Sequence, residues 1–363
     1  RCSRDWSSDV CSSDLTTGLT FNAGTSTINL NSSGTYALGG LTYNNVNFSV
    51  TSGVLTTLTG ANTFANLSIT APATGAIKTF NVSANQTVTG TFTANGSAYT
   101  SRIFFASSTL GTQYTITAAT VSASYCDFRD IIGAGAGTWS GTSFGNCGNN
   151  SGITFTATKT VYWNLAGSQP WSATGWCTTS GGTPAAANFP LAQDTAIIDN
   201  NSSITTMTFD ATWNIGTLDM SACTSAMTLA LSTTPPQVYG NWLNGTGVTI
   251  SGGTSLPFYG RSGQTITNNG VTFTCPIAIY CFGNSLTLND AFTSSYSGGN
   301  AILLTAGTFN ANTYNVTCAP TSGFSSGVVT YPRTVNIGSG TWKLGGSPWT
   351  VNPTNLTVSG NGT

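Results

Sequence analysis

The side chains that could do chemistry in this chain are few, and two of the most versatile types are absent. The 363 residues contain no histidine, and all ten acidic residues are aspartates, so there is no glutamate. Without histidine there is no Ser-His-Asp or Cys-His machinery and no histidine-ligated zinc, and without glutamate the common carboxylate acid/base schemes lose their usual residue. Any catalysis would therefore have to use Asp, Tyr, Lys or Cys.

Two pairs of aspartates are close enough in sequence to be considered as carboxylate pairs for hydrolysis or calcium binding. Asp127 and Asp130 are three residues apart, a spacing that places them on opposite faces of a strand unless a bulge intervenes. We therefore expect one of them to pair with Arg129 or to cap a turn. Asp194 and Asp199 flank an apolar stretch, and we interpret both as turn formers, because calcium needs several oxygen ligands from one loop.

Cysteine is the other reactive type. Of the nine cysteines, two lie before residue 15 and seven follow it, and no Cys-x-x-Cys pair occurs among the seven. No thiolate zinc or iron–sulfur site is indicated, and no cofactor is expected. Cys126 with Cys147 and Cys275 with Cys281 could form disulfides in an oxidising compartment. The alternative, which we favour, is buried thiols in the core.

Three tryptophans, Trp163, Trp171 and Trp176, lie in a Trp- and Pro-rich segment over residues 156–200. Their rings could form a platform for sugars, which makes them candidate glycan contacts. We favour the alternative that they form a capping cluster at the end of a repeat block, where open core and unpaired strand edges would otherwise face water.

Threonines recur in Thr-x-Thr units, which raise the hypothesis of an ice-binding face. The units lack one strict period, and outward threonines are common on any β-strand. We therefore interpret them as ordinary strand residues. The units are Thr87 with Thr89, Thr91 with Thr93, Thr265 with Thr267 and Thr272 with Thr274.

Charge is sparse: 19 of 363 residues are charged, or 5%, against about 25% in an ordinary soluble domain. Residues 1–15 carry five of these charges, and the stretch from Asp5 to Leu15 resembles one reading frame of a common sequencing-adapter oligonucleotide. We therefore expect residues 1–15 to be an artefact and leave them out of the fold. The rest of the chain has seven cations (9 minus 2) and seven aspartates (10 minus 3).

The composition excludes two kinds of partner. Phosphate binding needs clustered Lys and Arg, whereas the cations here are scattered singly, so nucleic acid is not an expected partner. The longest apolar runs are short pieces such as Ile302-Leu303-Leu304, far from the roughly 18 to 20 residues of a transmembrane helix. The scattered cations are Lys78, Arg102, Arg129, Lys159, Arg261, Arg333 and Lys343.

The elements that must position these side chains are short strands. Apolar and polar residues alternate with period two, as in residues 46–50 and 66–69, and Gly, Asn and Ser turn signals recur at intervals of about 8 to 12 residues. No stretch shows helical spacing. The pattern predicts an all-β fold, a parallel β-helix or β-solenoid in two blocks over residues 16–155 and 201–363, the second truncated, with residues 156–200 as a junction or cap. Tandem β-sandwiches are the alternative.

The Trp-rich segment carries a resemblance to known proteins. The chain resembles a loosely defined family of large, repetitive β-solenoid surface proteins of environmental bacteria and phages, in which such a cassette begins a new solenoid block. The resemblance covers roughly residues 100 to 363 and includes repeats similar to residues 303–318. The cassette positions are Tyr162, Trp163, Gly167, Trp171, Trp176, Ser180, Gly181, Gly182, Pro190, Asp194 and Asp199.

The resemblance implies an extracellular, cell-surface or virion location and brings no catalytic residues with it. Fibrous virion proteins of this kind are often homotrimers. We expect a non-enzymatic structural or adhesive segment, a rigid spacer that could attach to surface glycans. One alternative is a carbohydrate-active depolymerase that uses paired aspartates, and another is a pure binding module for glycans or ice, which would need an aligned aromatic strip or a flat threonine ladder on one face.

Overall fold

The computed structural model describes residues 20–49, 55–73, 75–260, 262–346 and 349–360. Residues 1–15, which we expected from the sequence to be an artefact, lie outside this range. Within it the chain consists of strands joined by turns, apart from a short 3-10 helix, η2 (Ala186–Asn188). The predicted all-β fold is confirmed. None of the described elements is a helix long and apolar enough to cross a membrane.

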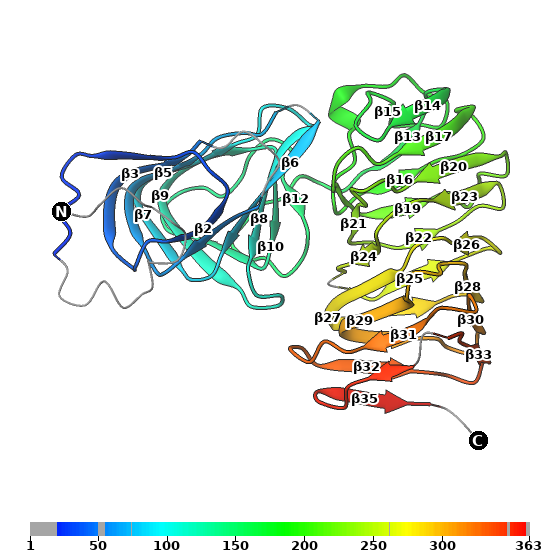
Figure 1. Cartoon of the computed structure of the whole chain (residues 1–363). Coiled ribbons are helices and arrows are strands. Elements are labelled where there is room, and N and C mark those ends of the chain that lie inside the picture. The colour runs from blue at the N-terminus through cyan, green and yellow to red at the C-terminus, as the bar shows by residue number, and fades with distance from the viewer. Residues whose placement is uncertain (1–19, 50–54, 74, 261, 347–348, 361–363) are drawn as a thin grey trace. The chain divides into compact units, whose positions relative to one another are not determined.

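The chain divides into two compact units. Unit 1 extends to Phe144 and includes Asn149–Thr156, and unit 2 comprises Gly145–Gly148 and Ala157–Thr363. Each unit is a stack of coils whose strands pair in parallel, which is a β-solenoid (Figure 1). The sandwich alternative does not fit, because sandwiches are built from antiparallel strands, whereas the antiparallel pairing of named strands here is confined, among the described pairs, to β13 with β15.

Unit 1 has two sheets, because successive strands alternate between them and each pairs with the next strand but one. The first sheet contains β1 (Thr27–Leu30), β3 (Thr42–Phe48), β5 (Thr63–Ile69), β7 (Gln86–Asn95), β9 (Tyr114–Ser124) and β11 (Ile131–Ala134). The second contains β2 (Gly34–Ala37), β4 (Thr56–Thr59), β6 (Ala76–Val82), β8 (Ser101–Ser107) and β10 (Cys126–Arg129).

Aromatic side chains fill the space between the sheets of unit 1. Phe48, Phe80 and Phe105 are fully buried on successive coils, with ring centroids 4.8 Å and 5.4 Å apart. Phe105 continues the column to Phe128 at 5.7 Å. Burial of each such ring contributes about 1.5 to 3 kcal/mol, so the core is a continuous column that stabilises every coil through its neighbours.

Unit 2 has three strand positions in most coils. The first is occupied by β13 (Thr160–Trp163), β16 (Thr195–Ile197), β19 (Thr217–Asp219), β22 (Trp242–Leu243), β25 (Gln264–Thr267), β32 (Arg333–Asn336) and β35 (Leu356–Ser359). The second is occupied by β14 (Gly167–Pro170), β17 (Ile204–Thr208), β20 (Met227–Ala230), β23 (Val248–Ser251), β26 (Thr272–Phe273), β28 (Phe292–Ser294), β30 (Val316–Cys318) and β33 (Trp342–Lys343).

The third strand position completes the coil. It is occupied by β18 (Asn214–Ile215), β21 (Gln237–Val238), β24 (Leu256–Phe258), β31 (Gly323–Ser326) and β34 (Thr350–Val351). Two long strands, β27 (Ile277–Leu288) and β29 (Asn300–Asn310), run through both the third and the first position, because each pairs with strands of both sets. The remaining strands of this unit are β12 (Gly145–Asn146) and β15 (Trp176–Cys177).

The register of unit 2 repeats closely from coil to coil. Leu218 pairs with Trp242, and Trp242 with Ile266, so two successive coils are 24 residues each (242 − 218 and 266 − 242). All three side chains are fully buried. Because the side-chain period of a strand is two, this register keeps the same residues inward on every coil and directs the intervening polar residues outward.

Outward side chains bind one another along the stack. In unit 1 the Asn66 Nδ2 donates to the Asn45 Oδ1 at 2.8 Å, and the Ser124 Oγ donates to the Asn95 Oδ1 at 2.9 Å. In unit 2 the Asn289 Nδ2 donates to the Thr267 Oγ1 at 3.2 Å. Neutral amides and hydroxyls can stack in this way without the repulsion that like charges would produce on neighbouring strands.

Candidate functional site

The three tryptophans of the cassette lie together at one end of the unit 2 core. Trp163 on β13 pairs across the antiparallel ladder with Trp176 on β15, and their rings meet edge to face at 5.0 Å. Trp171 contacts Trp176 at 4.7 Å and stacks on Phe209 of the next coil, also at 4.7 Å. Strand β15 is the edge of its sheet, so the indoles cover the first coil of this unit.

Burial decides what these tryptophans can bind. Trp163 and Trp171 are 0% exposed and Trp176 is 1% exposed. The Trp163 Nε1 donates to the Leu165 carbonyl at 2.8 Å, so its polar edge is used inside the protein. No ring face is open to a sugar, and the hypothesis that Trp163, Trp171 and Trp176 form a glycan platform does not fit this geometry.

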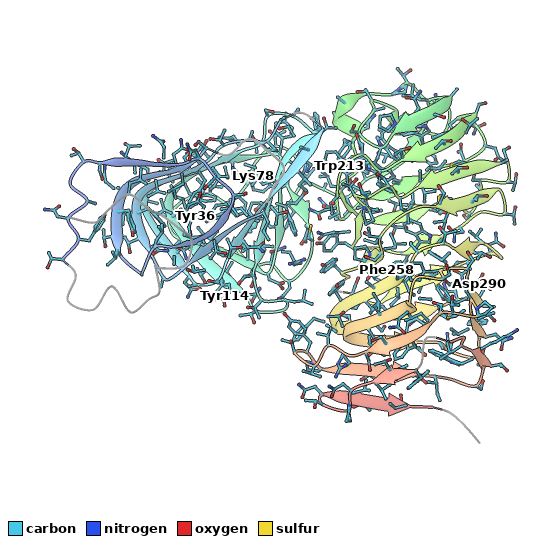
Figure 2. The ribbon with its side chains drawn as sticks, viewed as in Figure 1. Tyr36, Lys78, Tyr114, Trp213, Phe258 and Asp290 are labelled. Carbon is cyan, nitrogen blue, oxygen red and sulfur yellow. The ribbon has the colours of Figure 1, made fainter. Side chains whose placement is uncertain are left out.

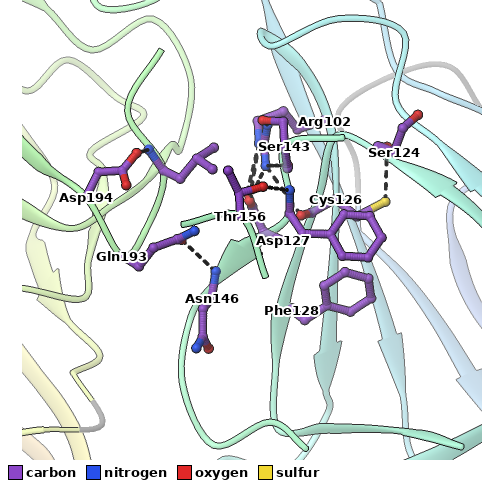
Figure 3. A network of polar contacts seen from close by, with 12 residues as sticks. Arg102, Ser124, Cys126, Asp127, Phe128, Ser143, Asn146, Thr156, Gln193 and Asp194 are labelled. Carbon is purple, nitrogen blue, oxygen red and sulfur yellow. Dashed lines mark hydrogen bonds and ion pairs between the residues drawn. The ribbon is translucent and has the colours of Figure 1, made fainter. Parts of the chain in front are cut away.

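Asp127 of the first aspartate pair forms a buried ion pair in unit 1. The Arg102 Nη2 lies 2.5 Å from the Asp127 Oδ1, and both residues are 1% exposed (Figure 3). The same guanidinium donates to the Ser143 Oγ at 3.0 Å and to the Ser143 carbonyl at 2.8 Å. The partner of Asp127 is thus Arg102 on the neighbouring strand β8, a pairing that the sequence analysis did not consider.

Asp130 has a different set of neighbours. It follows β10 with a φ of +60°, and its carboxylate accepts the Gly111 N–H at 3.1 Å and the Asn149 Nδ2 at 2.6 Å. The Arg129 Nε is 3.5 Å away. Asp130 therefore caps a turn and pairs with Arg129, as the sequence predicts. Asp127 and Asp130 bind separate donors and do not form a shared carboxylate site.

Asp194 and Asp199 both close turns in unit 2. The buried Asp194 carboxylate accepts the backbone N–H of Leu191 at 2.8 Å and of Lys159 at 3.0 Å, and it forms an ion pair with the Lys159 Nζ at 2.5 Å. The Asp199 carboxylate accepts the Asn201 N–H at 2.9 Å and the Ser180 hydroxyl at 2.5 Å. Their interpretation as turn formers agrees with these contacts.

The seven cysteines of the described chain are buried thiols, and neither of the two candidate disulfides is formed. Burial raises the pKa of the Cys126 thiol to about 12, that of Cys275 to about 12 and that of Cys318 to about 11. A thiol with a raised pKa is a poor nucleophile near neutral pH. These side chains therefore pack as small apolar groups.

No metal site is apparent in the part of the chain that the structure describes, since no three Cys or Asp side chains lie close enough there to hold an ion. Comparison of the chain with protein-family models, with curated proteins and with solved structures returned no match. The fold and the side chains together define the class of this protein, which is a parallel β-solenoid with few charged residues.

Buried cations are a feature that the sequence analysis missed. Lys78 on β6, which is labelled in Figure 2, is fully buried. Its Nζ donates to the carbonyls of Phe48 at 3.3 Å and Thr70 at 3.2 Å. Burial lowers the pKa of Lys78 from 10.5 to about 8. Arg333 on β32 is 2% exposed and donates to four carbonyls, those of Ser326, Tyr331, Asn352 and Thr354.

A groove of about 430 Å³ lies on the surface of unit 2. Three consecutive elements at the first strand position line it: β27 supplies Ser285, β29 supplies Thr308 and β32 supplies Thr334. The three residues are in register, Ser285 opposite Thr308 and Thr308 opposite Thr334. The sequence shows these residues but not their alignment, because they are separated by 23 and 26 residues.

Proposed function

We propose that the chain is a rigid, non-enzymatic structural segment of a large extracellular protein displayed on a bacterial cell or a virion. The observation that carries this proposal is the continuity of the coils within each of the two units. Core columns, backbone ladders and outer amide and hydroxyl ladders all repeat from coil to coil. In such stacks each coil is stabilised by its nearest neighbours, so stiffness extends along the axis.

The aspartates support a structural role, because each described one has a structural use. Beyond the four already placed, Asp210 accepts the Trp213 Nε1 at 2.8 Å, and Asp219 accepts the Ser221 N–H at 2.9 Å. Asp290 accepts the N–H groups of Asn268 and Asn269 at 2.7 Å and 2.6 Å. A depolymerase would need two carboxyl groups about 5 to 10 Å apart beside its substrate, whereas the groove on unit 2 is lined by hydroxyl, amide, glycine and proline residues.

The surface location rests on the resemblance to repetitive surface proteins and on the neutral exterior. Glycine, serine, threonine and asparagine provide turns and outer ladders that need no charged side chain. A spacer of this chemistry would extend a binding or anchoring element away from a surface without attracting ions or nucleic acid.

Pulling the full chain by its ends in an optical trap tests the spacer role. A coil of 24 residues releases about 80 Å of extended chain, at roughly 3.3 to 3.6 Å per residue. We expect the chain to lengthen in successive steps of about one coil or small multiples of it. Loss of all coils in a single step at low force would contradict a mechanical role, because the stack would then behave as one weak cooperative unit.

A further inference from the structure

The groove on unit 2 combines a hollow in the surface with outward hydroxyl groups. Some outward threonines are used within the protein: the Thr217 Oγ1 accepts the Asn241 N–H at 3.1 Å, and the Thr267 Oγ1 accepts from Asn289 at 3.2 Å. The hydroxyls of Ser285, Thr308 and Thr334 have no hydrogen-bond partner among the described residues. Three half-buried residues therefore line the hollow with hydroxyls that the described part of the protein does not bind.

The spacing of these hydroxyls is regular. Neighbouring strands of a sheet are about 4.8 Å apart, so Ser285, Thr308 and Thr334 present one hydroxyl per coil along the solenoid axis. That spacing is close to the length of one pyranose unit in an extended polysaccharide. A sugar chain lying along the axis would meet one hydroxyl of the protein per residue.

The walls of the groove are neutral, and two aromatic residues directly precede lining residues in the sequence. Asn284, Gly307 and Pro332 are further lining residues, and no lining residue is charged. Phe282 and Tyr331 lie next in sequence to lining residues, are half-buried, and contact each other edge to face at 5.9 Å. Small sites that combine a few fixed polar groups with aromatic surface bind ligands that are apolar on one face and rich in hydroxyls on the other.

We propose that this groove binds a neutral polysaccharide, with the sugar chain running along the solenoid axis across β27, β29 and β32. The hydroxyls of Ser285, Thr308 and Thr334 bond to the sugar hydroxyls, and the Phe282–Tyr331 pair packs against an apolar sugar face. This inference goes beyond the spacer role, since a spacer needs no ligand, and it places adhesion on a surface distant in sequence from the tryptophan cassette.

Binding of the full chain to soluble polysaccharides by affinity electrophoresis tests the proposal. The probes are a neutral β-glucan, an α-mannan and a galactan, with alginate and heparin as anionic comparisons. We expect at least one neutral probe to bind and the affinity to persist in about 0.5 M NaCl, because screening at a few Å weakens only charge-driven binding. Binding confined to the anionic probes, or to none, would overturn the proposal.

A triple variant, Ser285→Ala with Thr308→Val and Thr334→Val, removes the three hydroxyls and keeps strand-forming side chains. Each lost hydrogen bond weakens binding several-fold, so we expect a loss of tenfold or more in affinity. The matched control is Thr265→Val with Thr287→Val, because both threonines lie outward on the same sheet but outside the groove.

The control should bind as the wild type does, and both variants should keep the wild-type circular dichroism spectrum. Equal binding by the triple variant, or equal loss in the control, would contradict the groove assignment. A third outcome is that the protein binds no polysaccharide but inhibits ice growth, and that both variants reduce this inhibition equally. That outcome would assign the whole threonine face to ice binding and overturn the proposal.

Discussion

At the residue scale, unit 1 depends on a charge pair that is out of contact with water. Arg102 and Asp127 are each 1% exposed, and the guanidinium is held by the Asp127 carboxylate and by two oxygen atoms of Ser143. Removing one member of such a pair leaves the other charge desolvated without compensation. The pair therefore makes unit 1 sensitive to single substitutions that leave the apolar core unchanged.

Replacing Asp127 by Asn should destabilise unit 1 by about 3 kcal/mol, because the amide keeps the shape but not the charge that compensates Arg102. The free energy of unfolding of unit 1 is measured by guanidinium titration, with hydrogen-exchange mass spectrometry of unit 1 peptides as the readout. Asp290→Asn is the matched control, since Asp290 is only half-buried and caps a turn without an ion pair among the described residues; it should cost less than about 1 kcal/mol. Equal effects in the two variants would show that burial of the pair is unimportant.

The burial of Lys78 predicts a dependence of stability on alkaline pH. Its pKa is about 8 in the folded protein against 10.5 for an ordinary lysine. Between these values the unfolded chain holds the proton and the folded chain does not, so the free energy of unfolding rises with pH across this window. Below pH 8 Lys78 is protonated in both the folded and the unfolded chain. The folded protein is then destabilised by the full free energy of burying the charged ammonium group.

Comparison of the wild type with Lys78→Met checks this prediction, because contributions from other groups, including the thiol of Cys126, cancel in the difference. The free energy of unfolding of the wild type relative to the variant should increase from pH 7 to pH 10. Lys343→Met, at an exposed lysine, should show no such trend. A flat difference for Lys78→Met would mean that Lys78 reaches water.

The sequence contained a signal for these buried cations that composition alone hides. Lys78 has the same parity as Phe80 and Val82 on β6, and Arg333 has the same parity as Val335 on β32, and all three apolar residues are buried. A charged residue in phase with core residues points inward. Which carbonyls it meets could not be predicted, because those of Phe48 and Thr354 are brought close only by the coil turns.

At the element scale, the unusual strands are β27 and β29, which continue from the third strand position into the first. Their register shifts between Ile279 and Ser285. Gly307 permits this, because its φ is +82° and a Cβ there would lie 1.9 Å from the Cys281 carbonyl oxygen. The bulged pair also forms part of the groove, so this irregularity of the coil and the candidate binding site have one structural origin.

Gly307→Ala should therefore destabilise unit 2 by about 2 to 4 kcal/mol, the sum of a left-handed backbone and a backbone clash. Gly283→Ala is the control, because Gly283 has a similar φ of +73° but no atom within 4 Å of its Cβ position. The control should cost only the conformational term of about 1 to 2 kcal/mol. Thermal unfolding of both variants gives the comparison, and equal losses would contradict the close approach at Gly307.

The sequence predicts where strands form better than it predicts which strands pair. Alternation in stretches such as residues 46–50 and 66–69 predicted buried and exposed faces, because that pattern is local. The pairing of Thr308 with Thr334, or of Trp163 with Trp176, depends on how many residues each turn consumes, and these turns vary in length. The groove and the tryptophan cluster are products of register, and sequence alone does not show register.

At the scale of the whole molecule, unit 2 has two different ends. The first coil is covered by Trp163, Trp171 and Trp176, with β15 added antiparallel at the sheet edge. At the other end of the described stack, β35 pairs on one side with β32, and Val351 and Val358 are 40% and 55% exposed. Because each coil is stabilised by its neighbours, the stack should open from the end with fewer contacts.

Hydrogen-exchange mass spectrometry of the full chain should show this asymmetry directly. We expect backbone amides of β32 and β35 to exchange first, those of β13 and β16 later, and those of β27 and β29 last. Trp176→Ala removes a buried ring worth about 3 to 5 kcal/mol, so it should speed exchange in β13 and β16 and leave β32 and β35 unchanged. Trp342→Ala on β33, the matched control, should have the opposite pattern. If Trp176→Ala instead raised exchange equally in every coil, unit 2 would unfold as a single cooperative block, and neither the capping role of the tryptophans nor the coil-by-coil extension expected of a spacer would hold.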